Sequence, residues 1–371
     1  MTNFDRNSLA AQLLHHYGQG LKPGDSVVPA IVPTAVYHLP GDPSNAPYHY
    51  GRYHNPTCEA LEVALALLEG AETIVFPSGM AGIAAILLVS LKTGDKVLIP
   101  SDGYFTTRVL AEKFLTPYGV ETVTRPTANF MEGGFDGFRL VLAETPSNPG
   151  LDVCDIAAIA AQTKRANALF VVDNTTMTPL GQRPLSLGAD VVVNADTKAI
   201  NGHSDVLMGH VSSQKADVIA SLHAWRRYAG AVVGPFEAWQ VLRGMETLEV
   251  RFERMCVNAG AIAERLAVHR KVVAVRYPGL ASDPSHAISR KQMLQFGSMI
   301  TVTLASTQAA EQFISDCAFI QPSTSFGGVR TCAERRARWG DQVPDGLIRL
   351  SMGIEPLAPL WDSMERALER L

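Results

Sequence analysis

The feature that most constrains this chain is a repeated alternation of short apolar runs and amphipathic stretches between about residues 57 and 194. We expect a helix over 57–70 that ends at Gly70, a strand over 73–76 and a second helix over 80–94. Further strands are predicted at 96–100, 119–123, 139–143, 169–172 and 190–194, with helices at 104–118 and 155–165. Continuous Val, Ile and Leu runs separated by helices are typical of a mostly parallel sheet covered on both faces. The sequence therefore predicts a doubly wound α/β fold.

The sequence on either side of this region has a different texture. Residues 1–55 are rich in Pro, Gly, His and Tyr and lack a sustained period, which predicts an N-terminal arm with little core of its own. A helical stretch over 236–269 is followed by predicted strands at 272–276 and 298–304 and by a final helix from Leu360. We therefore predict a large domain over 56–235 and a smaller C-terminal α+β domain over 236–371.

Charge and apolar patterning exclude several classes of function. The 371 residues carry 32 Lys and Arg against 36 Asp and Glu, a net charge of −4, which argues against a nucleic-acid partner. The longest apolar run, 82–91, is about half as long as a membrane span, and the start of the chain lacks a signal pattern. We therefore expect no membrane partner and a cytoplasmic protein. Five scattered cysteines without a CxxC pair favour reduced thiols over disulfides or zinc.

Polar residues follow several predicted strands, and each alone has an ordinary structural explanation. The turn at 77–80 either offers free N–H groups at a helix start to an anion or is a tight connection. The segment 144–149 either leaves the Asn148 amide available to a ligand or is a rigid turn. Asp173 directly follows a buried strand, so its carboxylate either caps the next segment or faces a cationic ligand.

Lys198 is one of only nine lysines and lies just beyond the apolar run at 191–193. Desolvation beside an apolar sheet lowers the pKa of an amine, which suits Schiff-base chemistry, whereas a solvated surface lysine is the ordinary alternative. Ligands of open α/β sheets bind at the carboxyl ends of the strands, so the lysine, the acid, the amide and the anion turn form one set. Pyridoxal 5′-phosphate (PLP) needs an amine, an acid for its pyridine nitrogen and an anion cradle, so this set predicts PLP as the cofactor.

Seven segments of the sequence also resemble motifs of the Cys/Met-metabolism, PLP-dependent transsulfuration family. They are YGRYHNPT (50–57), FPSGM (76–80), ETPSNPG (144–150), VVDNTT (171–176), DTKAINGHSDVLMGH (196–210), SFGG (325–328) and RLSMGIE (349–355). The resemblance runs in consistent order over about residues 28–365. It implies a fold-type-I PLP-dependent architecture and a homotetramer built from two active dimers.

The resemblance also implies which residues hold the cofactor. Lys198 matches the Schiff-base lysine that moves protons on the substrate, and Asp173 matches the partner of the pyridinium nitrogen. Phosphate-binding positions are matched by Gly79, Met80 and Thr197. Tyr50 and Arg52 match a pair that reaches the phosphate of the neighbouring subunit, which would explain an arm without its own core.

Other matched positions concern the substrate. Tyr104 matches a tyrosine that stacks on the cofactor ring and acts as an acid or base in elimination. Arg349, together with Asn148, matches the group that binds the substrate carboxylate, a task that suits a planar guanidinium. Ser325 matches a position near the catalytic lysine.

The sequence departs from the family pattern at several positions. Ala195 replaces a serine that bonds the cofactor phosphate, so cofactor affinity is expected to be lower unless another group substitutes. Phe105-Thr106 replaces the usual Gly-Gly or Gly-Cys, which argues against a typical methionine γ-lyase. Arg330 replaces an acid, and we expect it to favour an anionic distal group on the substrate. His203 and His210 lie seven residues apart without a third ligand, so we expect no metal.

Together these observations predict a γ-lyase acting on a sulfur-containing L-amino acid, L-cystathionine, to give L-cysteine, 2-oxobutyrate and ammonia. The main alternative is γ-replacement by a γ-synthase or an O-acylhomoserine sulfhydrylase, possible in specialised metabolism. A nicotinamide-dependent oxidoreductase would share the sheet, but no GxGxxG follows the first strand. A catalytically inactive, binding-only relative is the remaining alternative.

Overall fold

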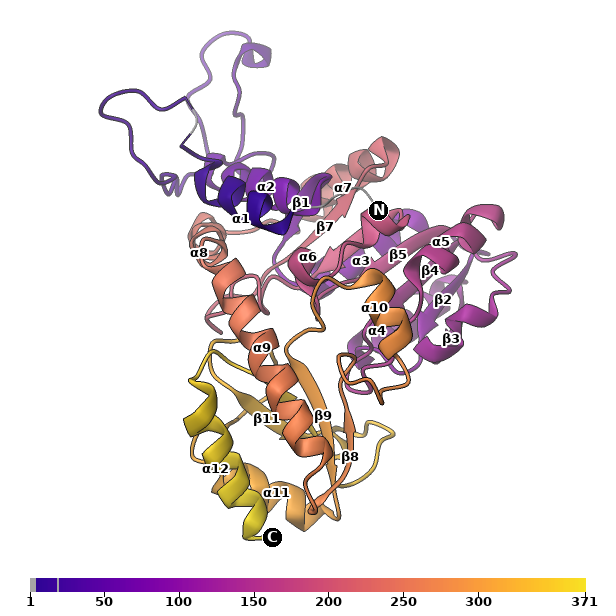
Figure 1. Ribbon diagram of the computed structural model, residues 1–371. Helices are drawn as coiled ribbons and strands as arrows, with labels where there is room; N and C mark the ends of the chain where they lie inside the picture. Colours follow the sequence, from indigo (N-terminus) through magenta and orange to yellow (C-terminus); the bar gives the residue numbers. More distant parts are fainter. Residues whose placement is uncertain (1–4, 19) are drawn as a thin grey trace.

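The computed structural model describes residues 5–18 and 20–371 (Figure 1). Over these residues the strands are β1 (Glu72–Phe76), β2 (Lys96–Pro100), β3 (Glu121–Arg125), β4 (Leu140–Glu144), β5 (Leu169–Asp173), β6 (Val191–Asn194), β7 (Gly209–Ser213), β8 (Val272–Arg276), β9 (Met299–Leu304), β10 (Gln321–Pro322), β11 (Cys332–Arg335) and β12 (Leu347–Ser351). The α-helices are α1 (Arg6–His15), α2 (Pro56–Glu69), α3 (Gly79–Ser90), α4 (Phe105–Phe114), α5 (Ile156–Arg165), α6 (Thr178–Gly181), α7 (Ala216–Ala229), α8 (Pro235–Met245), α9 (Leu248–Ala267), α10 (His286–Gln292), α11 (Thr307–Asp316) and α12 (Leu357–Glu369). No helix in this described part of the chain is long and apolar enough to cross a membrane.

The larger sheet has the strand order β1-β7-β6-β5-β4-β2-β3 and is parallel through its middle. The ladders that join β3, β2, β4, β5 and β6 are parallel, whereas β7 pairs antiparallel with both β6 and β1. The predicted doubly wound, mostly parallel α/β sheet is therefore confirmed. The apolar pattern does not predict β7, because its sequence GHVSS contains buried polar residues, His210, Ser212 and Ser213.

Helices cover both faces of this sheet, and its strands are apolar on both sides. Leu142 of β4 packs in one core with residues of α3 and α7. Its neighbour Val141 points to the opposite face and packs in a second core with residues of α5. The register places Glu144 beside Asp173, so β4 and β5 end next to each other at one edge. This edge is where a parallel sheet presents ligand-binding residues.

The second sheet has the order β10-β11-β12-β9-β8 and packs against α9, α11 and α12. The helical stretch predicted over 236–269 is divided in the structure, because α8 ends at Met245 and α9 begins at Leu248. Phe252 near the start of α9 belongs to a core with α2 and α8, whereas Leu266 near its end belongs to the core of the second sheet. The boundary predicted between residues 235 and 236 stays a prediction.

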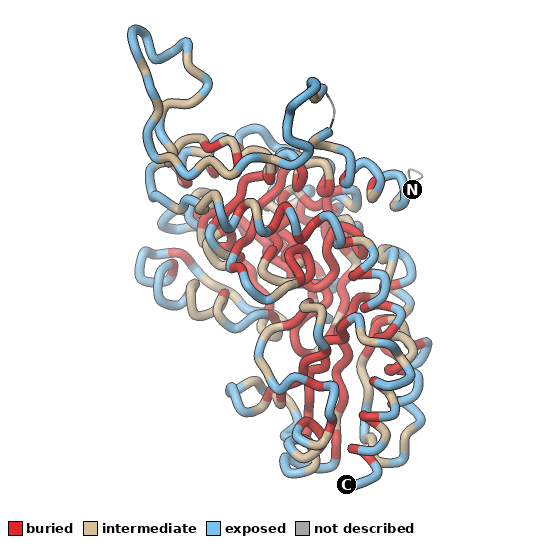
Figure 2. The backbone as a smooth tube through the Cα atoms, turned by 90° about the vertical axis from the view of Figure 1, so that its left-hand side faces the viewer, coloured by how far each residue is buried: buried red, intermediate tan, exposed pale blue. Residues whose placement is uncertain are grey.

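The arm is more structured at its start than the sequence pattern predicts. Asp5 caps α1 by accepting hydrogen bonds from the N–H groups of Asn7 and Ser8. Leu9 and Leu13 of α1 are buried in a core shared with α2. The sequence pattern therefore missed the helix α1, whose two buried leucines join this core, and the predicted contact of the arm with a neighbouring subunit stays a prediction. Residues 20–54 are largely exposed and extend away from the body of the chain, as Figures 1 and 2 show.

Candidate active site

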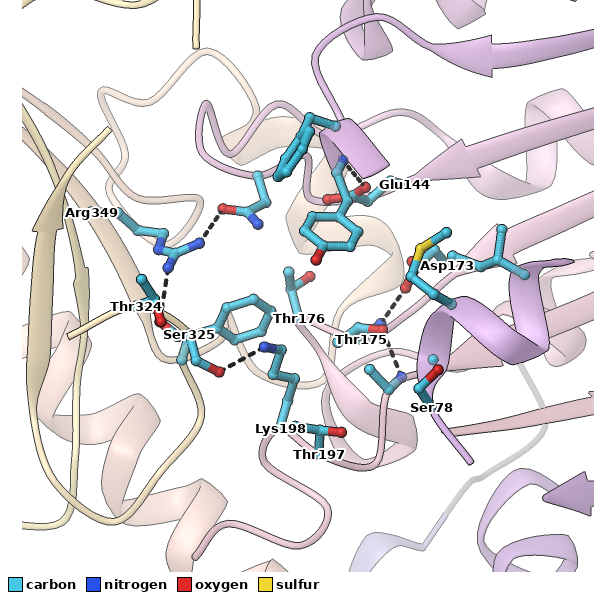
Figure 3. A pocket seen from close by; sticks show the side chains of 18 of the residues that line it. Ser78, Glu144, Asp173, Thr175, Thr176, Thr197, Lys198, Thr324, Ser325 and Arg349 are labelled. Carbon is cyan, nitrogen blue, oxygen red and sulfur yellow. Dashed lines mark hydrogen bonds between the residues drawn. The ribbon is translucent and has the colours of Figure 1, made fainter. Parts of the chain in front are cut away.

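A cavity of about 370 Å³ opens at the carboxyl ends of β4, β5 and β6 and is closed on its other side by the second sheet (Figure 3). Every site residue predicted from the sequence lines it except Tyr50 and Arg52. These lining residues are Gly79, Met80, Tyr104, Asn148, Asp173, Thr197, Lys198, Ser325 and Arg349. The structure therefore brings together groups that lie up to 270 residues apart, from Gly79 to Arg349.

Lys198 follows β6 and points into the middle of the cavity (Figure 3). Its Nζ donates a hydrogen bond of 2.6 Å to Ser325 Oγ and lies 4.8 Å from the centre of the Phe326 ring. Burial and the positive charge of Arg349 lower the pKa of the Lys198 amine to about 8, although the nearby Asp173 opposes this shift. With this pKa about a tenth of the amine is unprotonated at pH 7, far more than for an ordinary lysine, and the unprotonated form is the one that acts as a nucleophile or base.

Asp173 ends β5 and is almost fully buried. Its Oδ1 accepts a hydrogen bond of 3.0 Å from the Thr175 N–H, yet burial raises the pKa of this carboxyl above its usual range. On the adjacent strand, burial and the charge of Asp173 raise the pKa of Glu144 well above its usual range. A cationic ligand group facing Asp173 would relieve this desolvation, as a pyridinium nitrogen does.

The turn before α3 provides an anion cradle. Ser78 caps the helix by accepting a hydrogen bond of 3.0 Å from the Ala81 N–H, and the first helical residues, Gly79 and Met80, line the cavity. A Cβ on Gly79 would lie 2.6 Å from the Ala195 Cβ, so only glycine fits this contact. The free N–H groups and dipole of a helix N-terminus favour a phosphate.

Thr197 lines the same end of the cavity, but its hydroxyl is already engaged. Its Oγ1 donates to the Met208 carbonyl at 3.1 Å and accepts from the Met208 N–H at 2.9 Å. Ala195, beside it, has no hydroxyl. Within one chain, the phosphate cradle therefore depends chiefly on the backbone N–H groups at the start of α3.

This arrangement fits PLP. The Lys198 amine, the buried Asp173 carboxylate and the helix N-terminus at Gly79 face one cavity. Glycine at position 79 has no side chain that could cover the backbone N–H groups. An aldehyde, a pyridine nitrogen and a phosphate are the groups that these three features would hold.

Arg349 enters from β12 and is also almost fully buried. Its Nη1 donates to Asn148 Oδ1 at 2.9 Å, and its Nη2 donates to the Ser325 carbonyl at 2.8 Å and to the Glu334 carboxylate. Glu334 lies directly opposite Arg349 in the antiparallel ladder of β11 and β12. These contacts hold the guanidinium in one orientation, as recognition of a carboxylate requires.

Tyr104 lies at the mouth of the cavity as the residue before α4, with 40% of its surface exposed. Its backbone N–H donates a hydrogen bond of 2.6 Å to Glu144 Oε2. Its ring meets that of Phe105 edge to face, with 5.5 Å between the ring centres. The residue that replaces glycine in the family pattern thus supports the tyrosine ring from one side.

Tyr50 and Arg52 lie in the arm, away from the cavity of their own chain. The Arg52 Nη1 donates to the Arg227 carbonyl at 2.6 Å, and its guanidinium lies 5.3 Å from the centre of the Tyr50 ring. Tyr50 is 40% exposed. Their predicted reach to the phosphate of a neighbouring subunit stays a prediction.

Sequence reasoning did not find three further lining residues, Glu334, Arg336 and Trp339. Arg336 donates to Glu334 Oε1 at 2.7 Å and pairs with Asp341, and the Trp339 N–H donates to Glu334 Oε2 at 2.8 Å. Burial disfavours the charge on Glu334, but Arg349 and Arg336 outweigh burial and lower its pKa. These residues lie in a charge-rich run, and their local sequence does not indicate a binding site. Their position follows from the pairing of β11 with β12, which places Glu334 opposite Arg349.

The structure corrects the expectation for Arg330. This residue is exposed and is not among the residues that line the cavity. The arginine that contributes charge to the cavity wall is Arg336, six residues later. Arg330 precedes β11, which begins at Cys332, whereas Arg336 follows the end of that strand at Arg335.

Comparison with known proteins agrees with this site. A family model described as "Cys/Met metabolism PLP-dependent enzyme" matches residues 11–369. The chain is 44% identical over 352 residues to a "Putative cystathionine gamma-lyase" of Streptomyces coelicolor, covering 93% of this chain and 89% of the relative. It is 36% identical to a cystathionine beta-lyase of Lactococcus lactis subsp. cremoris, covering 98% and 99%.

A solved structure is similar over nearly the whole chain. It is the cystathionine gamma synthase from Xanthomonas oryzae pv. oryzae in complex with aminoacrylate and cysteine. The TM-score is 0.93 at 33% sequence identity, and the match covers 98% of each chain. These likenesses support the predicted fold type and overturn the nicotinamide alternative.

Proposed function

Because this chain belongs to the Cys/Met metabolism PLP-dependent enzyme family, we propose that it catalyses γ-elimination on L-cystathionine, giving L-cysteine, 2-oxobutyrate and ammonia. PLP is the cofactor, and when bound it supplies the electron sink for negative charge at the substrate Cα. The observation that carries the proposal is the position of the Lys198 amine, with Asp173 on one side and Arg349 on the other (Figure 3).

Arg349 orients the substrate by binding its α-carboxylate. Asn148 and Glu334 fix the guanidinium from two sides, so its remaining N–H groups present a defined surface to that carboxylate. A carboxylate held there places the substrate Cα near the Lys198 amine. Fixed positioning of this kind replaces a bimolecular encounter by a nearly unimolecular one.

Lys198 and Tyr104 move the protons. The amine of Lys198 removes the proton from the substrate Cα and then from Cβ, and its lowered pKa suits a base that works near neutral pH. Ser325 accepts a hydrogen bond from this amine and keeps it directed into the cavity. The Tyr104 hydroxyl, at the cavity mouth, delivers a proton to the departing sulfur.

γ-Replacement is the second candidate function, because a solved cystathionine gamma synthase matches the chain with a TM-score of 0.93. Elimination and replacement use the same carboxylate-binding and proton-moving groups. They differ in whether water or a second nucleophile completes the reaction. A homotetramer and a cytoplasmic location also stay predictions.

The test compares substrates in parallel. Purified protein loaded with PLP is incubated with cystathionine, methionine and an O-acylhomoserine, each with and without added thiol, and 2-oxobutyrate and cysteine are measured. The proposal expects 2-oxobutyrate and cysteine from cystathionine without thiol. Product formed only with thiol would assign replacement, and pyruvate with homocysteine from cystathionine would assign β-elimination.

A further inference from the structure

A buried cluster of charges lies beneath the loop that carries Lys198. It consists of Glu69 at the end of α2, Asp196 just after β6, and His210 in β7. The His210 Nδ1 lies 2.6 Å from Asp196 Oδ1, and its Nε2 lies 3.0 Å from Glu69 Oε1. All three side chains are buried, and Asn194 donates a further hydrogen bond of 2.8 Å to Glu69. We call these three residues the charged clamp.

Geometry and the surrounding charge together indicate a positively charged His210. A neutral imidazole has one N–H, whereas both ring nitrogens here face a carboxylate oxygen within hydrogen-bond distance. An imidazolium donates to both carboxylates, and the Asn194 amide nitrogen lies 3.3 Å from Nε2. Burial opposes its charge, but Asp196 and Glu69 outweigh burial and raise the His210 pKa to about 10. One cation therefore compensates two buried anions, which would repel each other without it.

The charged clamp closes the base of the loop between β6 and β7. Asn194 and His210 are the last residues paired in the antiparallel ladder of these strands. Beyond them the Thr197 N–H donates to the Met208 carbonyl at 3.1 Å, and the Asn201 N–H donates to the Asp196 carbonyl at 2.9 Å. Asp196 is two residues from Lys198, so its side chain fixes the start of the turn that presents the amine.

Residues next to the charged clamp in sequence contact the turn over residues 77–80, which we call the phosphate turn. Ala195, next to Asp196, touches Gly79, and a Cβ on Gly79 would lie 2.6 Å from the Ala195 Cβ. Gly209, next to His210, approaches Gly79 as closely, since a Cβ on Gly209 would lie 2.5 Å from the Gly79 Cα. Ala195 and Gly209, which flank the Asp196–His210 bond, are therefore packed against the start of α3 at Gly79.

This placement matters because the cradle has few side-chain donors. Ala195 has no hydroxyl, and the Thr197 hydroxyl bonds Met208. Phosphate binding then depends on backbone N–H groups at Gly79 and Met80 and on their position relative to Lys198. A displacement of the loop of the order of 1 Å is enough to weaken such a fixed arrangement strongly.

We propose that Glu69, Asp196 and His210 act together as a charged clamp that holds the Lys198 loop against the phosphate turn, which makes His210 a positioning residue for PLP. The charged clamp is separate from the reacting groups, since none of its three residues lines the cavity. Its effect therefore concerns cofactor binding and does not depend on which substrate the enzyme uses.

The test measures PLP binding in His210→Gln. This change leaves two buried carboxylates without their cation. We expect the Kd for PLP to rise at least about tenfold, with a weaker visible absorption band at equal PLP, because a displaced Lys198 loop no longer holds the amine and the backbone donors in one fixed arrangement. Asp283→Asn is the matched control, because Asp283 is an equally buried carboxylate paired with Arg276 outside the cavity. It should lower Tm and leave the Kd within about twofold.

Two further variants keep the test decisive. Asp196→Asn retains the His210–Glu69 pair and should fold readily, with a Kd raised about threefold. The double variant His210→Gln/Asp196→Asn has the charge of the wild-type clamp, one anion, and should bind PLP more tightly than His210→Gln alone. If all clamp variants lose only Tm, as the control does, with unchanged Kd and absorption, the positioning role is wrong. A double variant no better than His210→Gln would show that the two residues do not act as a pair.

Discussion

Lys198 and Ser325 lie 127 residues apart in the sequence, yet the amine of one donates a 2.6 Å hydrogen bond to the hydroxyl of the other. Lys198 follows β6 of the seven-stranded sheet, whereas Ser325 lies between β10 and β11 of the second sheet. The direction of the amine is therefore set by the docking of the two halves of the chain, and the first prediction concerns this bond.

Replacing Ser325 by alanine should slow the reaction without releasing the cofactor. Without its acceptor the Lys198 amine samples other directions, so we expect kcat to fall about 10- to 100-fold. The Kd for PLP should stay within about threefold, because Ser325 is remote from the phosphate turn. Ser323→Ala is the control, since Ser323 lies on the same segment outside the cavity. Equal kcat for Ser325→Ala and Ser323→Ala would contradict the role of the bond.

The lowered pKa of Lys198 predicts how the cofactor-free protein takes up PLP. Only the unprotonated amine attacks the aldehyde, so the rate of PLP capture should rise with pH through a midpoint near 8. Stopped-flow absorbance in the visible range measures this rate. Arg349→Gln removes a neighbouring cation and should move the midpoint to higher pH. A midpoint near the ordinary lysine pKa in the unmodified protein would disprove the effect of burial.

Arg349→Lys tests the recognition of the substrate carboxylate. Lysine keeps the charge but loses the planar fork that Asn148 and Glu334 hold in place. We expect KM to rise at least about 30-fold, near 2 kcal/mol, with a smaller change in kcat. Arg335→Lys, on the adjacent strand with its side chain bonded to Glu311, should leave KM unchanged. Similar KM values in both variants would count against Arg349 as the carboxylate-binding group.

Arg336 and Arg330 give opposite expectations although they lie close in sequence. Arg336→Ala removes the cation that pairs with Asp341 and one of the cations that pair with Glu334 at the cavity wall. We therefore expect kcat/KM to fall at least about tenfold. Arg330→Ala changes an exposed residue outside the cavity and should stay within about twofold. The reverse order of effects would restore the sequence-based expectation that Arg330 shapes the substrate region.

If the arm completes the phosphate site of a neighbouring subunit, the activity of each site depends on both subunits. Arg52→Ala should weaken PLP retention although Arg52 lies away from its own cavity. Mixing Arg52→Ala with Lys198→Ala should restore up to about a quarter of wild-type activity, because random pairing gives half mixed dimers with one intact site each. Verified mixed dimers without recovered activity would show that the arm acts only within its own chain.

Much of this fold follows from local pattern, and the exceptions have physical causes. Apolar runs such as Val191–Asn194 are buried on both faces, so their strands are evident from sequence alone. β7 is not evident, because His210 is satisfied by Asp196 and Glu69, partners distant in sequence. In such a strand, tertiary contacts compensate for the missing apolar pattern.

The residues of the candidate site likewise fall into those that the sequence predicts and those that it does not. Asp173 and Lys198 follow buried strands of one parallel sheet, and the carboxyl ends of such strands meet at one edge, so their proximity is predictable. Glu334 lies in the second sheet and Trp339 follows its strand β11. Nothing in their local sequence indicates which face of that sheet meets the first. Their position depends on the docking of two cores, which short-range patterns do not encode.

Helix α9 determines how this cavity can open. One end of the helix is embedded with Phe252 in the core beneath α2, and the other end with Leu266 in the core of the second sheet. The helix contains no proline at which it could kink. The helix therefore connects the two cores rigidly. A hinge motion between the two sheets would have to pull one end of α9 out of the core in which it is packed. Passage of substrate and product then relies on the rim of the cavity, where Phe105 and Trp339 are half exposed.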